Sequence, residues 1–364
     1  MEQTSQREIR AIDPTWTIAD ITARLAKALA DEGPAITLGP ISVETVPSEI
    51  AVVVSTSGST GDAKEVGLSA AAIFASAKAT NKFFGASAGQ TWSLLLPLTH
   101  IAGINVLARA LELGTVPIDA RGITSKYPDA DYTAIVPTQL FRALNGDGDL
   151  LAHLQSAKSV LVGGAALDKN LGDQARTAGI NIVESYGMTE TCGGCVYDGL
   201  PIGDTSVEIN KDGLIKISTA SLATTYLNDV SGWSSKLEDG YFLTSDLGEI
   251  KGGKLTVTGR ADDVIVTGGE NISLTKVEEV IRNTFAGIEC AAFAIADQQW
   301  GQALHLAIAG SVKPEISLIN QSLSSQISAA AKIKGAIYLD QLPRTALDKV
   351  NRQELANLAL RKGK

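Results

Sequence analysis

The sequence is poor in the residues that build disulfide frameworks and metal clusters. Its 364 residues include only three cysteines and three histidines. Three cysteines, an odd number spread over so long a chain, do not make a disulfide framework. Cys192 and Cys195 form a CxxC within TETCGGC, but zinc needs two further ligands, and Cys290 and the histidines lie far along the chain. We therefore interpret this pair as small buried residues beside a glycine turn.

Long apolar runs and an excess of positive charge are also missing. No apolar run approaches the roughly eighteen residues that span a bilayer, and the N-terminal MEQTSQREIRAIDPTW lacks a signal-peptide pattern, so we expect a cytoplasmic protein. The formal charge of -9 argues against nucleic acid as a partner, because phosphate backbones demand clustered Lys and Arg. With 45% hydrophobic and 20% charged residues, the composition is that of a globular protein.

What the sequence does contain is an alternation of short apolar runs with Ala-rich helical stretches. The pattern predicts strands at 51–54, 93–98, 132–137, 159–164 and 180–185, and helices at 68–84, 103–113, 138–144 and 167–179. Apolar strands in alternation with helices indicate a largely parallel sheet with helices on its faces. The chain is long for one core, which favours one large domain and one smaller domain.

The pattern changes twice in the second half of the chain. From about residue 200, hairpin-like strands with DG and GG turns indicate a β subdomain. After 260–263 the alternation resumes in a unit large enough to fold with its own core, with a helix opened by a capping box from Thr275 to Glu278 and a closing helix after Asn351. We therefore expect an α/β fold with a large domain at 1–259 and a small domain at 260–364.

The loop STSGSTGDAK follows an apolar strand and has the composition of a phosphate-binding loop. Hydroxyls and glycines alternate in it, and a lysine ends it: Ser55, Thr56, Ser57, Gly58, Ser59, Thr60, Gly61 and Lys64. It almost matches GxxxxGK[ST], but Ala63 replaces the second glycine and Glu65 replaces the magnesium-binding hydroxyl. Because Glu65 in that place would repel phosphate, we do not expect a P-loop NTPase. The loop lies where open α/β sheets bind ligands and is expected to hold phosphate in another way.

Four further stretches carry candidate site residues, each weak alone because a lone Asp or Lys is usually a surface charge. They are SYGMTE with Tyr186, Thr189 and Glu190, GYFLTSDLGEI with Asp246, GRADDVIVTGGEN with Arg260, and LPRTALDKVNRQEL with Lys349. Together with the loop, their order and spacing resemble the adenylate-forming superfamily of acyl-CoA synthetases, luciferases and nonribosomal adenylation domains. The resemblance runs from about Ser55 to Arg352, which is most of the chain.

This resemblance implies a fold, ligands and residue roles. The fold is that of an acyl-CoA synthetase, with a large N-terminal domain, a β subdomain and a small mobile C-terminal domain. Ser55 to Lys64 would cover the β and γ phosphates of ATP, and Glu190 would bind Mg²⁺. The remaining nucleotide-binding residues would be Gly163, Gly164 and Ala165 along the adenine, Tyr186 against its face, the neighbouring Ser185, Gly187 and Met188, Thr189 at the α-phosphate, and Asp246 and Arg260 at the ribose.

The same resemblance implies a second substrate and a moving domain. Coenzyme A would pass Gly268 and Gly269 on its way to the acyl group, and His100 would lie near the acyl pocket and the pantetheine channel, although a core histidine is the alternative for that residue. Lys349 would be the catalytic lysine. Asp262 matches the hinge about which the small domain would rotate and withdraw Lys349 between two half-reactions.

The implied activity is the ATP-dependent conversion of a carboxylic acid to an acyl adenylate and then to a CoA thioester. LLLPLTHIAGINVLARAL, AIVPTQL and VLVGGAAL look most like the o-succinylbenzoate-CoA ligases of menaquinone biosynthesis. The alternatives are a CoA ligase for another aryl or acyl acid, a stand-alone adenylation domain that loads a carrier protein, and a non-catalytic nucleotide-binding relic. Departures from the family pattern are the 54 residues before the loop, Ala63, Glu65 and Asp348. A homodimer is left open.

Overall fold

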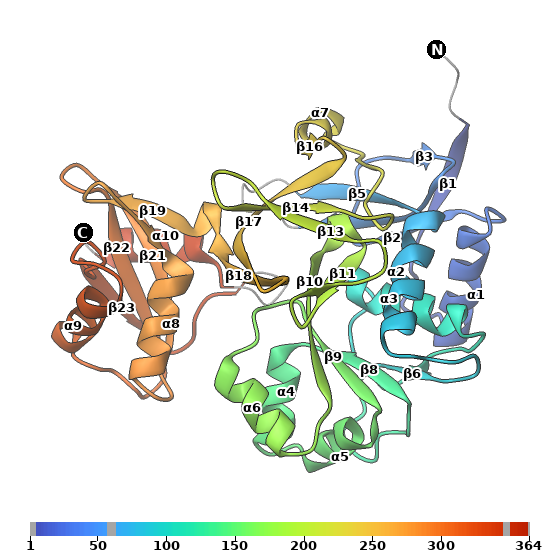
Figure 1. Cartoon of the computed structure of the whole chain (residues 1–364), viewed down its shortest axis with the longest axis horizontal. Helices are drawn as coiled ribbons and strands as arrows, with labels where there is room; N and C mark the ends of the chain where they lie inside the picture. Colours follow the sequence, from blue (N-terminus) through green and yellow to red (C-terminus); the bar gives the residue numbers. More distant parts are fainter. Residues whose placement is uncertain (1–4, 57–62, 345–349, 363–364) are drawn as a thin grey trace. The chain divides into compact units, whose positions relative to one another are not determined.

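The structure is a computed structural model that describes residues 5–56, 63–344 and 350–362 (Figure 1). These residues form two compact units. The first comprises Met1–Glu208, Lys216–Thr244 and Ile250–Thr256, and the second comprises Ile209–Ile215, Ser245–Glu249 and Val257–Lys364. The domain boundary between residues 259 and 260 stays a prediction. Within the described parts of the chain, every helix is too short or too polar to cross a bilayer.

A seven-stranded sheet is the centre of the first unit, and its order is β12-β11-β10-β9-β8-β6-β7. The strands are β6 (Trp92–Leu94), β7 (Ile118–Asp119), β8 (Tyr132–Ile135), β9 (Ser159–Val162), β10 (Ile182–Met188), β11 (Gly193–Tyr197) and β12 (Leu200–Pro201). Those from β7 to β10 pair in parallel, whereas β11 and β12 pair antiparallel. This confirms the expected largely parallel sheet.

Helices cover both faces of this sheet, because the side chains of each strand alternate between two cores. Leu161 packs in the cluster that contains α2 (Ala70–Phe83) and α3 (Ile101–Glu112), while its neighbours Val160 and Val162 pack in the cluster of α4, α5 and α6. The last three helices are α4 (Pro137–Leu144), α5 (Gly148–Ser156) and α6 (Lys169–Thr177). Helix starts carry the expected signals: Ser69, Asp147 and Asp168 cap α2, α5 and α6.

A second sheet in this unit, of order β15-β5-β4-β2-β1-β3, contains elements that the sequence analysis did not predict. Its strands are β1 (Gln6–Ala11), β2 (Ala35–Leu38), β3 (Thr45–Pro47), β4 (Ile50–Thr56), β5 (Lys64–Ser69) and β15 (Thr225–Tyr226), and α1 (Ile18–Leu29) lies between β1 and β2. The buried Arg7 of β1 donates hydrogen bonds to carbonyl oxygens of Gly33, Ile50 and Ala28. One guanidinium therefore ties the start of β1 to the end of α1 and to β4.

A five-stranded sheet of order β13-β14-β17-β16, with β18 beside β17, contains residues of both units. Its strands are β13 (Ser206–Ile209), β14 (Leu214–Ser218), β16 (Leu237–Glu238), β17 (Tyr241–Lys251) and β18 (Lys254–Arg260), and the short helix α7 (Val230–Ser234) precedes β16. The expected hairpin turns are confirmed: Gly213 has φ 81°, and Gly252 and Gly253 have φ 57° and 78°, values that glycine accepts without strain.

The second unit has its own sheet, of order β20-β19-β22-β21 with β23 paired to β22. The elements are β19 (Val264–Thr267), β20 (Glu270–Ser273), α8 (Leu274–Thr284), β21 (Glu289–Asp297), β22 (Gly301–Ala309), α9 (Ile316–Gln326), β23 (Gly335–Leu339) and α10 (Arg352–Lys362). Cys290 and Ala292 of β21 face the core that contains α8 and α9, whereas Ala291 and Phe293 face the core that contains α10. Both faces are thus covered.

The capping box predicted for α8 is wrong. The N-cap is Ser273, whose side chain accepts a hydrogen bond from the backbone N–H of Lys276. The cap therefore lies two residues before Thr275, the predicted cap. Glu278 is buried, accepts the backbone N–H of Ala292 and pairs with Arg352. Its carboxylate serves tertiary packing, which overrides the local helix-start pattern.

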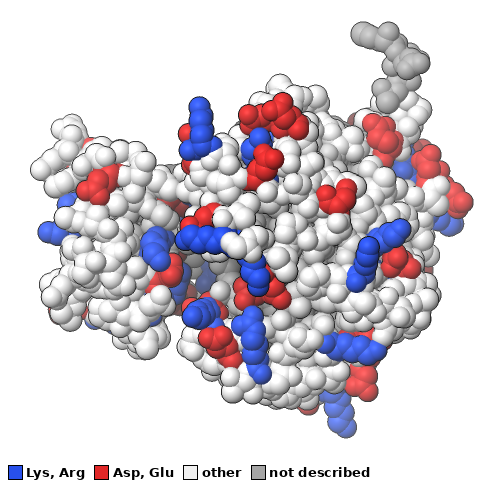
Figure 2. Space-filling view, viewed as in Figure 1, with Lys and Arg blue, Asp and Glu red and all other residues white. Residues whose placement is uncertain are grey.

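Surface charges are mixed. On the face that Figure 2 shows, Lys and Arg side chains lie among Asp and Glu side chains, and no continuous basic stripe crosses that face.

Candidate functional site

The serine- and glycine-rich loop connects two antiparallel strands. Thr56 at the end of β4 pairs with Lys64 at the start of β5, and Ser55 pairs with Glu65. Ser57, Gly58, Ser59, Thr60 and Gly61 lie outside the described residues. A P-loop derives part of its phosphate binding from the N-terminus of a following helix. Here a strand follows, which agrees with the expectation that the chain is not a P-loop NTPase.

Glu65, which occupies the hydroxyl position of the P-loop pattern, has a buried side chain. Successive side chains of a strand point to opposite faces, and Glu65 is therefore turned away from its neighbour Lys64. Its side chain is 4% exposed, and Oε1 accepts the backbone N–H of Ser42. The departure from the P-loop pattern places this carboxylate in the core of the second sheet.

Lys64 and Glu190 are brought together by a residue that the sequence analysis missed. The Lys64 Nζ lies 3.5 Å from the Tyr226 hydroxyl and 4.5 Å from the centre of its ring. The Tyr226 hydroxyl donates to Glu190 Oε1 at 2.7 Å. Burial, together with the charge of Glu190, raises the pKa of Tyr226, so the phenol stays a donor. Tyr226 lies in SLATTYLND, which contains no motif, and only the pairing of β15 with β5 reveals it.

The predicted adenine-binding residues share one edge of the parallel sheet. β9 and β10 pair in parallel with Glu184 opposite Val162. The residues that follow these two, Gly163 and Ser185, therefore lie beside each other at this edge of the sheet. A Cβ on Gly163 would lie 3.2 Å from the Cβ of Ser185, and Gly164 has φ 84°. Gly164 and Ala165 are exposed, and Tyr186 is half-buried. Carboxyl ends of parallel strands are where open α/β sheets bind ligands.

The turn from β10 to β11 carries Thr189 and Glu190 in a short 3-10 helix, Thr189–Thr191. Thr191 fixes this turn, because its hydroxyl accepts the backbone N–H of Met188 at 3.0 Å and donates to the carbonyl of Gly193 at 2.7 Å. Gly187 lies against Gly193 so closely that a Cβ on it would collide with the Gly193 carbonyl. The positions of Thr189 and Glu190 are therefore set by backbone packing.

Two helices, α2 and α3, also hold this turn. Asn105 of α3 and Ser76 of α2 both donate to the carbonyl oxygen of Cys192, at 2.7 Å and 3.0 Å. Cys192 itself has the left-handed φ of 53°. Sequence reasoning missed Asn105, since a single Asn within an apolar helix looks like an ordinary core position.

His100 begins the same helix. It is the N-cap residue of α3, is half-buried, and its Nδ1 lies 2.8 Å from the Thr99 hydroxyl. The ring thus belongs to a half-buried residue at the start of a helix. Its role near an acyl pocket stays a prediction.

The two cysteines of the CxxC pair are buried, as expected. Cys192 and Cys195 are buried, and burial raises the pKa of each thiol to about 12. Among residues 5–56, 63–344 and 350–362, no three His, Cys, Asp or Glu side chains gather in a way that could hold a metal ion. A single carboxylate such as that of Glu190 is sufficient for Mg²⁺ that is bound to the phosphates of a nucleotide, because Mg²⁺ is commonly held by one or two carboxylates together with substrate oxygens.

The second unit holds the remaining predicted residues. Asp246 is 8% exposed and lies 3.1 Å from Arg260, which also pairs with Asp262 at 2.8 Å. Gly268 and Gly269, with φ of 60° and 82°, form the turn between β19 and β20. The structure therefore brings the predicted ribose residues and the predicted hinge residue into one ion-pair cluster.

Lys349 lies outside the described residues, but both ends of its segment are described. Arg344 and Val350 form an antiparallel bridge, and the Asn351 backbone N–H donates to the Pro343 carbonyl at 2.8 Å. Arg352 then donates to Glu278 at 2.6 Å and to the Ala292 carbonyl at 2.8 Å. The residues on both sides of 345–349 are thus anchored to the core of the second unit.

This chain is similar to known proteins in sequence and in fold. The family model described as "AMP-binding enzyme" matches residues 3–218. A probable 2-succinylbenzoate--CoA ligase from Mycobacterium tuberculosis is 36% identical over 337 residues, which cover 87% of each chain. An indoleacetate--CoA ligase from Aromatoleum aromaticum is 28% identical and covers 84% of this chain and 67% of its own.

Among solved structures, the o-succinylbenzoate CoA synthetase from Bacillus subtilis in complex with its acyl-adenylate intermediate superposes with a TM-score of 0.76. That match has 22% identity and covers 95% of this chain and 82% of the other. The expected adenylate-forming fold is confirmed. Since the family model matches more than half of the sequence and the 36% identical relative matches along most of it, the chain belongs to the AMP-binding enzyme family.

Proposed function

We propose that the protein is an ATP-dependent acid-CoA ligase whose acid is 2-succinylbenzoate, acting in menaquinone biosynthesis. It joins the acid to AMP with release of pyrophosphate, and then transfers the acyl group to coenzyme A with release of AMP. The observation that carries this proposal is the grouping of Lys64, Tyr226 and Glu190 in the first unit. It supplies a cation and a carboxylate beside a sheet edge in a chain of the AMP-binding family.

The first half-reaction joins two anions, so its barrier comes largely from charge repulsion. A carboxylate oxygen of the acid forms a bond to the α-phosphorus of ATP, and the bond from that phosphorus to the bridging oxygen of the β-phosphate breaks. Lys64 would bind the pyrophosphate end, and the Thr189 hydroxyl would contact the α-phosphate. Glu190 and the phosphates would hold Mg²⁺, which would neutralise part of the negative charge that develops in the reaction.

Tyr226 has a supporting part in this arrangement. The Tyr226 hydroxyl donates to one carboxylate oxygen of Glu190 and so orients that carboxylate. The second carboxylate oxygen of Glu190 would then be available to bind the metal ion. Its ring lies under the ammonium of Lys64. One buried phenol thus sets the positions of both charged groups.

The second half-reaction uses a thiol. The CoA thiol releases its proton to solvent, its sulfur forms a bond to the acyl carbon of the adenylate, and AMP leaves with the electrons of the acyl-oxygen bond. We propose that Lys349 serves the first half-reaction only and leaves the site when residues 260–364 rotate about Asp262. We also propose that Asp246 and Arg260 bind the ribose, that the glycines of the β19–β20 turn border the pantetheine arm, and that His100 lies near the acyl group.

The choice of acid rests on the relative from Mycobacterium tuberculosis, which is named for 2-succinylbenzoate. A second candidate is a CoA ligase for another aryl acid, which is favoured by the similarity to an indoleacetate--CoA ligase. Because ATP and CoA are both available in the cytoplasm, we propose that the enzyme works there. A homodimer stays a hypothesis, for which sedimentation velocity of the purified protein is the test.

The deciding experiment mixes the purified protein with ATP, Mg²⁺, CoA and a panel of carboxylic acids that includes 2-succinylbenzoate and indoleacetate. Mass spectrometry identifies the products. We expect 2-succinylbenzoyl-CoA and AMP in equal amounts. A thioester with another acid alone would replace the substrate and retain the mechanism, while ATP binding without AMP from any acid would favour a carrier-dependent adenylation domain or a non-catalytic protein.

Lys349→Ala separates the two half-reactions. We expect it to slow adenylate formation strongly and to leave thioester formation from supplied acyl adenylate nearly unchanged. Lys332→Ala, at an exposed position of the same unit, is the control for loss of one positive charge. Equal loss in both half-reactions would contradict the rotation.

A further inference from the structure

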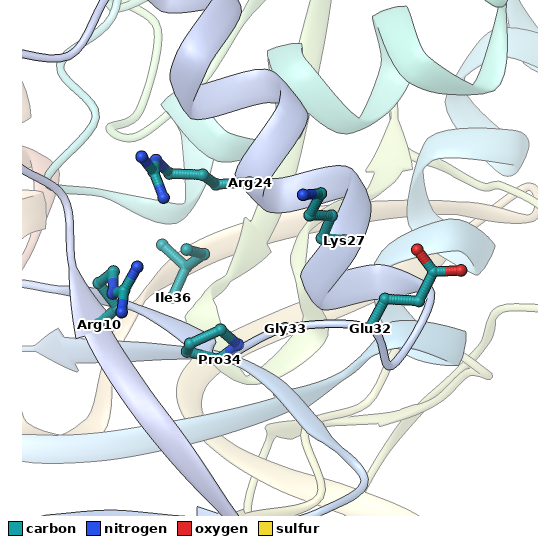
Figure 3. Close-up of a pocket in the computed structure, with 7 residues that line it drawn as sticks. All are labelled: Arg10, Arg24, Lys27, Glu32, Gly33, Pro34 and Ile36. Atoms are coloured by element: carbon teal, nitrogen blue, oxygen red, sulfur yellow. The ribbon is translucent and has the colours of Figure 1, made fainter.

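A small pocket in the first unit lies between β1, α1 and β2 (Figure 3). Its volume is about 180 Å³, and Arg10, Arg24, Lys27, Glu32, Gly33, Pro34 and Ile36 line it. None of these residues belongs to the predicted nucleotide or acyl sites. The pocket therefore needs an explanation of its own.

The fold dictates that these side chains meet. Arg10 of β1 and Ile36 of β2 are direct partners in a parallel pair, so both side chains point to the same face of the sheet. Arg24 and Lys27 are three residues apart and share one face of α1, whose other contacts include β2. Three cations are thus directed into one space by regular secondary structure.

Among the described residues, these cations form no direct ion pair, although the charge of Arg24 helps to lower the pKa of its neighbours Asp13 and Asp20. Within the described parts of the chain, no hydrogen bond or ion pair joins the side chains of Arg10, Arg24 or Lys27 to a carboxylate. Glu32 is the one acid in the lining, and Figure 3 shows its carboxylate beyond Lys27, at the end opposite the two guanidinium groups. Among the residues that line the pocket, three cations stand against one acid, while Asp13 and Asp20 lie outside the lining.

Arg24 is already held in place for binding. Its guanidinium lies 4.1 Å from the centre of the Trp16 ring, a stacking contact that restricts the side chain. Its Nε is enclosed and lacks a hydrogen-bond partner among the described residues. Because the Nε is shielded, an oxyanion in the pocket would be bound by the two terminal nitrogens of this guanidinium.

We propose that this pocket binds a small organic anion, with a carboxylate or phosphate group between Arg10 and Arg24 and a compact apolar body against Ile36 and Pro34. Guanidinium groups match the planar oxygens of carboxylate and phosphate. The buried side chain of Ile36 and the ring of Pro34 give an apolar floor that inorganic ions cannot use. This ligand is separate from ATP, CoA and the acid that the proposed ligase activates.

The test is calorimetric titration of the full-length protein at low salt with four probes: benzoate, phthalate, phenyl phosphate and inorganic phosphate. Saturating AMP is present throughout, so that the nucleotide site does not contribute. We expect saturable binding of the aromatic probes and weaker binding of inorganic phosphate. The affinity for phthalate, compared with the affinity for phenyl phosphate, then shows whether the pocket prefers a carboxylate or a phosphate group.

Two variants and one control locate the binding. Arg24→Gln and Arg10→Gln should each weaken probe binding about tenfold to a hundredfold, as expected for loss of one charged hydrogen-bond partner. Lys78→Gln, at an exposed position of α2 outside the pocket, should leave it unchanged. Arg10 lies on an exposed part of β1, so its variant is expected to fold even if loss of the Trp16 contact destabilises Arg24→Gln.

Thermal unfolding gives an independent readout. A probe that binds the folded protein should raise the melting temperature of wild type and of Lys78→Gln, and should have less effect on the two arginine variants. Equal affinities in wild type and both arginine variants, or no saturation with any probe, would overturn the proposal. Neither readout requires turnover, so failure of the proposed ligase activity would be recognised separately.

Discussion

Arg352 is expected to hold together the part of the second unit that carries Lys349. It follows the 345–349 segment by three residues and begins α10, and its guanidinium donates to Glu278 at 2.6 Å, to the Ala292 carbonyl at 2.8 Å and to Asp263 at 3.3 Å. Arg352→Met keeps the length of the side chain and removes all three hydrogen bonds. The variant therefore measures what the buried charge network contributes.

The magnitude follows from exposure and from the partners that remain. Removal of one partner of a buried ion pair costs about 3 to 5 kcal/mol. Arg352 is 25% exposed, and Glu278 would keep the backbone N–H of Ala292 and the more distant Arg282 at 3.6 Å. We therefore expect a loss of about 2 to 3 kcal/mol, below the full range for an isolated buried charge.

Native-state hydrogen exchange is the assay, because it reports the opening free energy of amides in β21 and β22 without assuming that both units unfold together. Arg282→Met is the matched control. It removes a cation that faces the same carboxylate from an exposed helical position, and it should cost below about 0.5 kcal/mol. If both variants lowered the opening free energy equally, the reasoning from burial would be refuted.

Three further predictions concern the first unit. Tyr226→Phe removes the hydrogen bond to Glu190 and should lower kcat/KM for ATP about tenfold or more, measured by pyrophosphate release; an unchanged value would contradict its orienting part. His100→Ala should slow thioester formation while equilibrium dialysis still detects ATP binding, and an unchanged rate would assign His100 to structure alone. Burial raises the thiol pKa of Cys192 and Cys195 from 9.0 to about 12, so their contribution to stability is complete below pH 9 and is lost as the pH rises toward 12. Urea unfolding between pH 8 and 11 should show this decline, and Cys192→Ala should make it shallower.

The sequence predicts the parallel sheet well because apolar periodicity is a local property. The runs at 132–137 and 159–164 became β8 and β9, and the helix expected at 167–179 became α6 at Lys169–Thr177. The strands and helix before residue 51 were missed. β1 exposes most of its residues, and the Arg7 side chain that ties it to α1 and β4 finds its partners only in the folded chain.

The candidate site was predictable where motifs carry it and not where packing carries it. SYGMTE identified Glu190, but nothing in the sequence could identify Tyr226, which lies 36 residues later and reaches Glu190 through the pairing of β15 with β5. Glu65 illustrates the opposite error. Its position in the P-loop pattern suggested that it would repel phosphate, whereas strand alternation directs its side chain into the protein interior.

The glycines at the β10–β11 turn bear on how sequence variation in this protein is interpreted. Gly187 lies against the backbone of Gly193, and a Cβ on Gly194 would collide with the hydroxyl of Ser185. A side chain at Gly187 would displace the turn, and one at Gly194 would force the Ser185 side chain to move, so selection would act on Gly187 even if no nucleotide were ever bound. Invariance of glycine there would report a steric requirement of the fold. A drifted, inactive descendant that kept its fold should retain Gly187, and loss of activity would be visible first at Glu190 and Lys64.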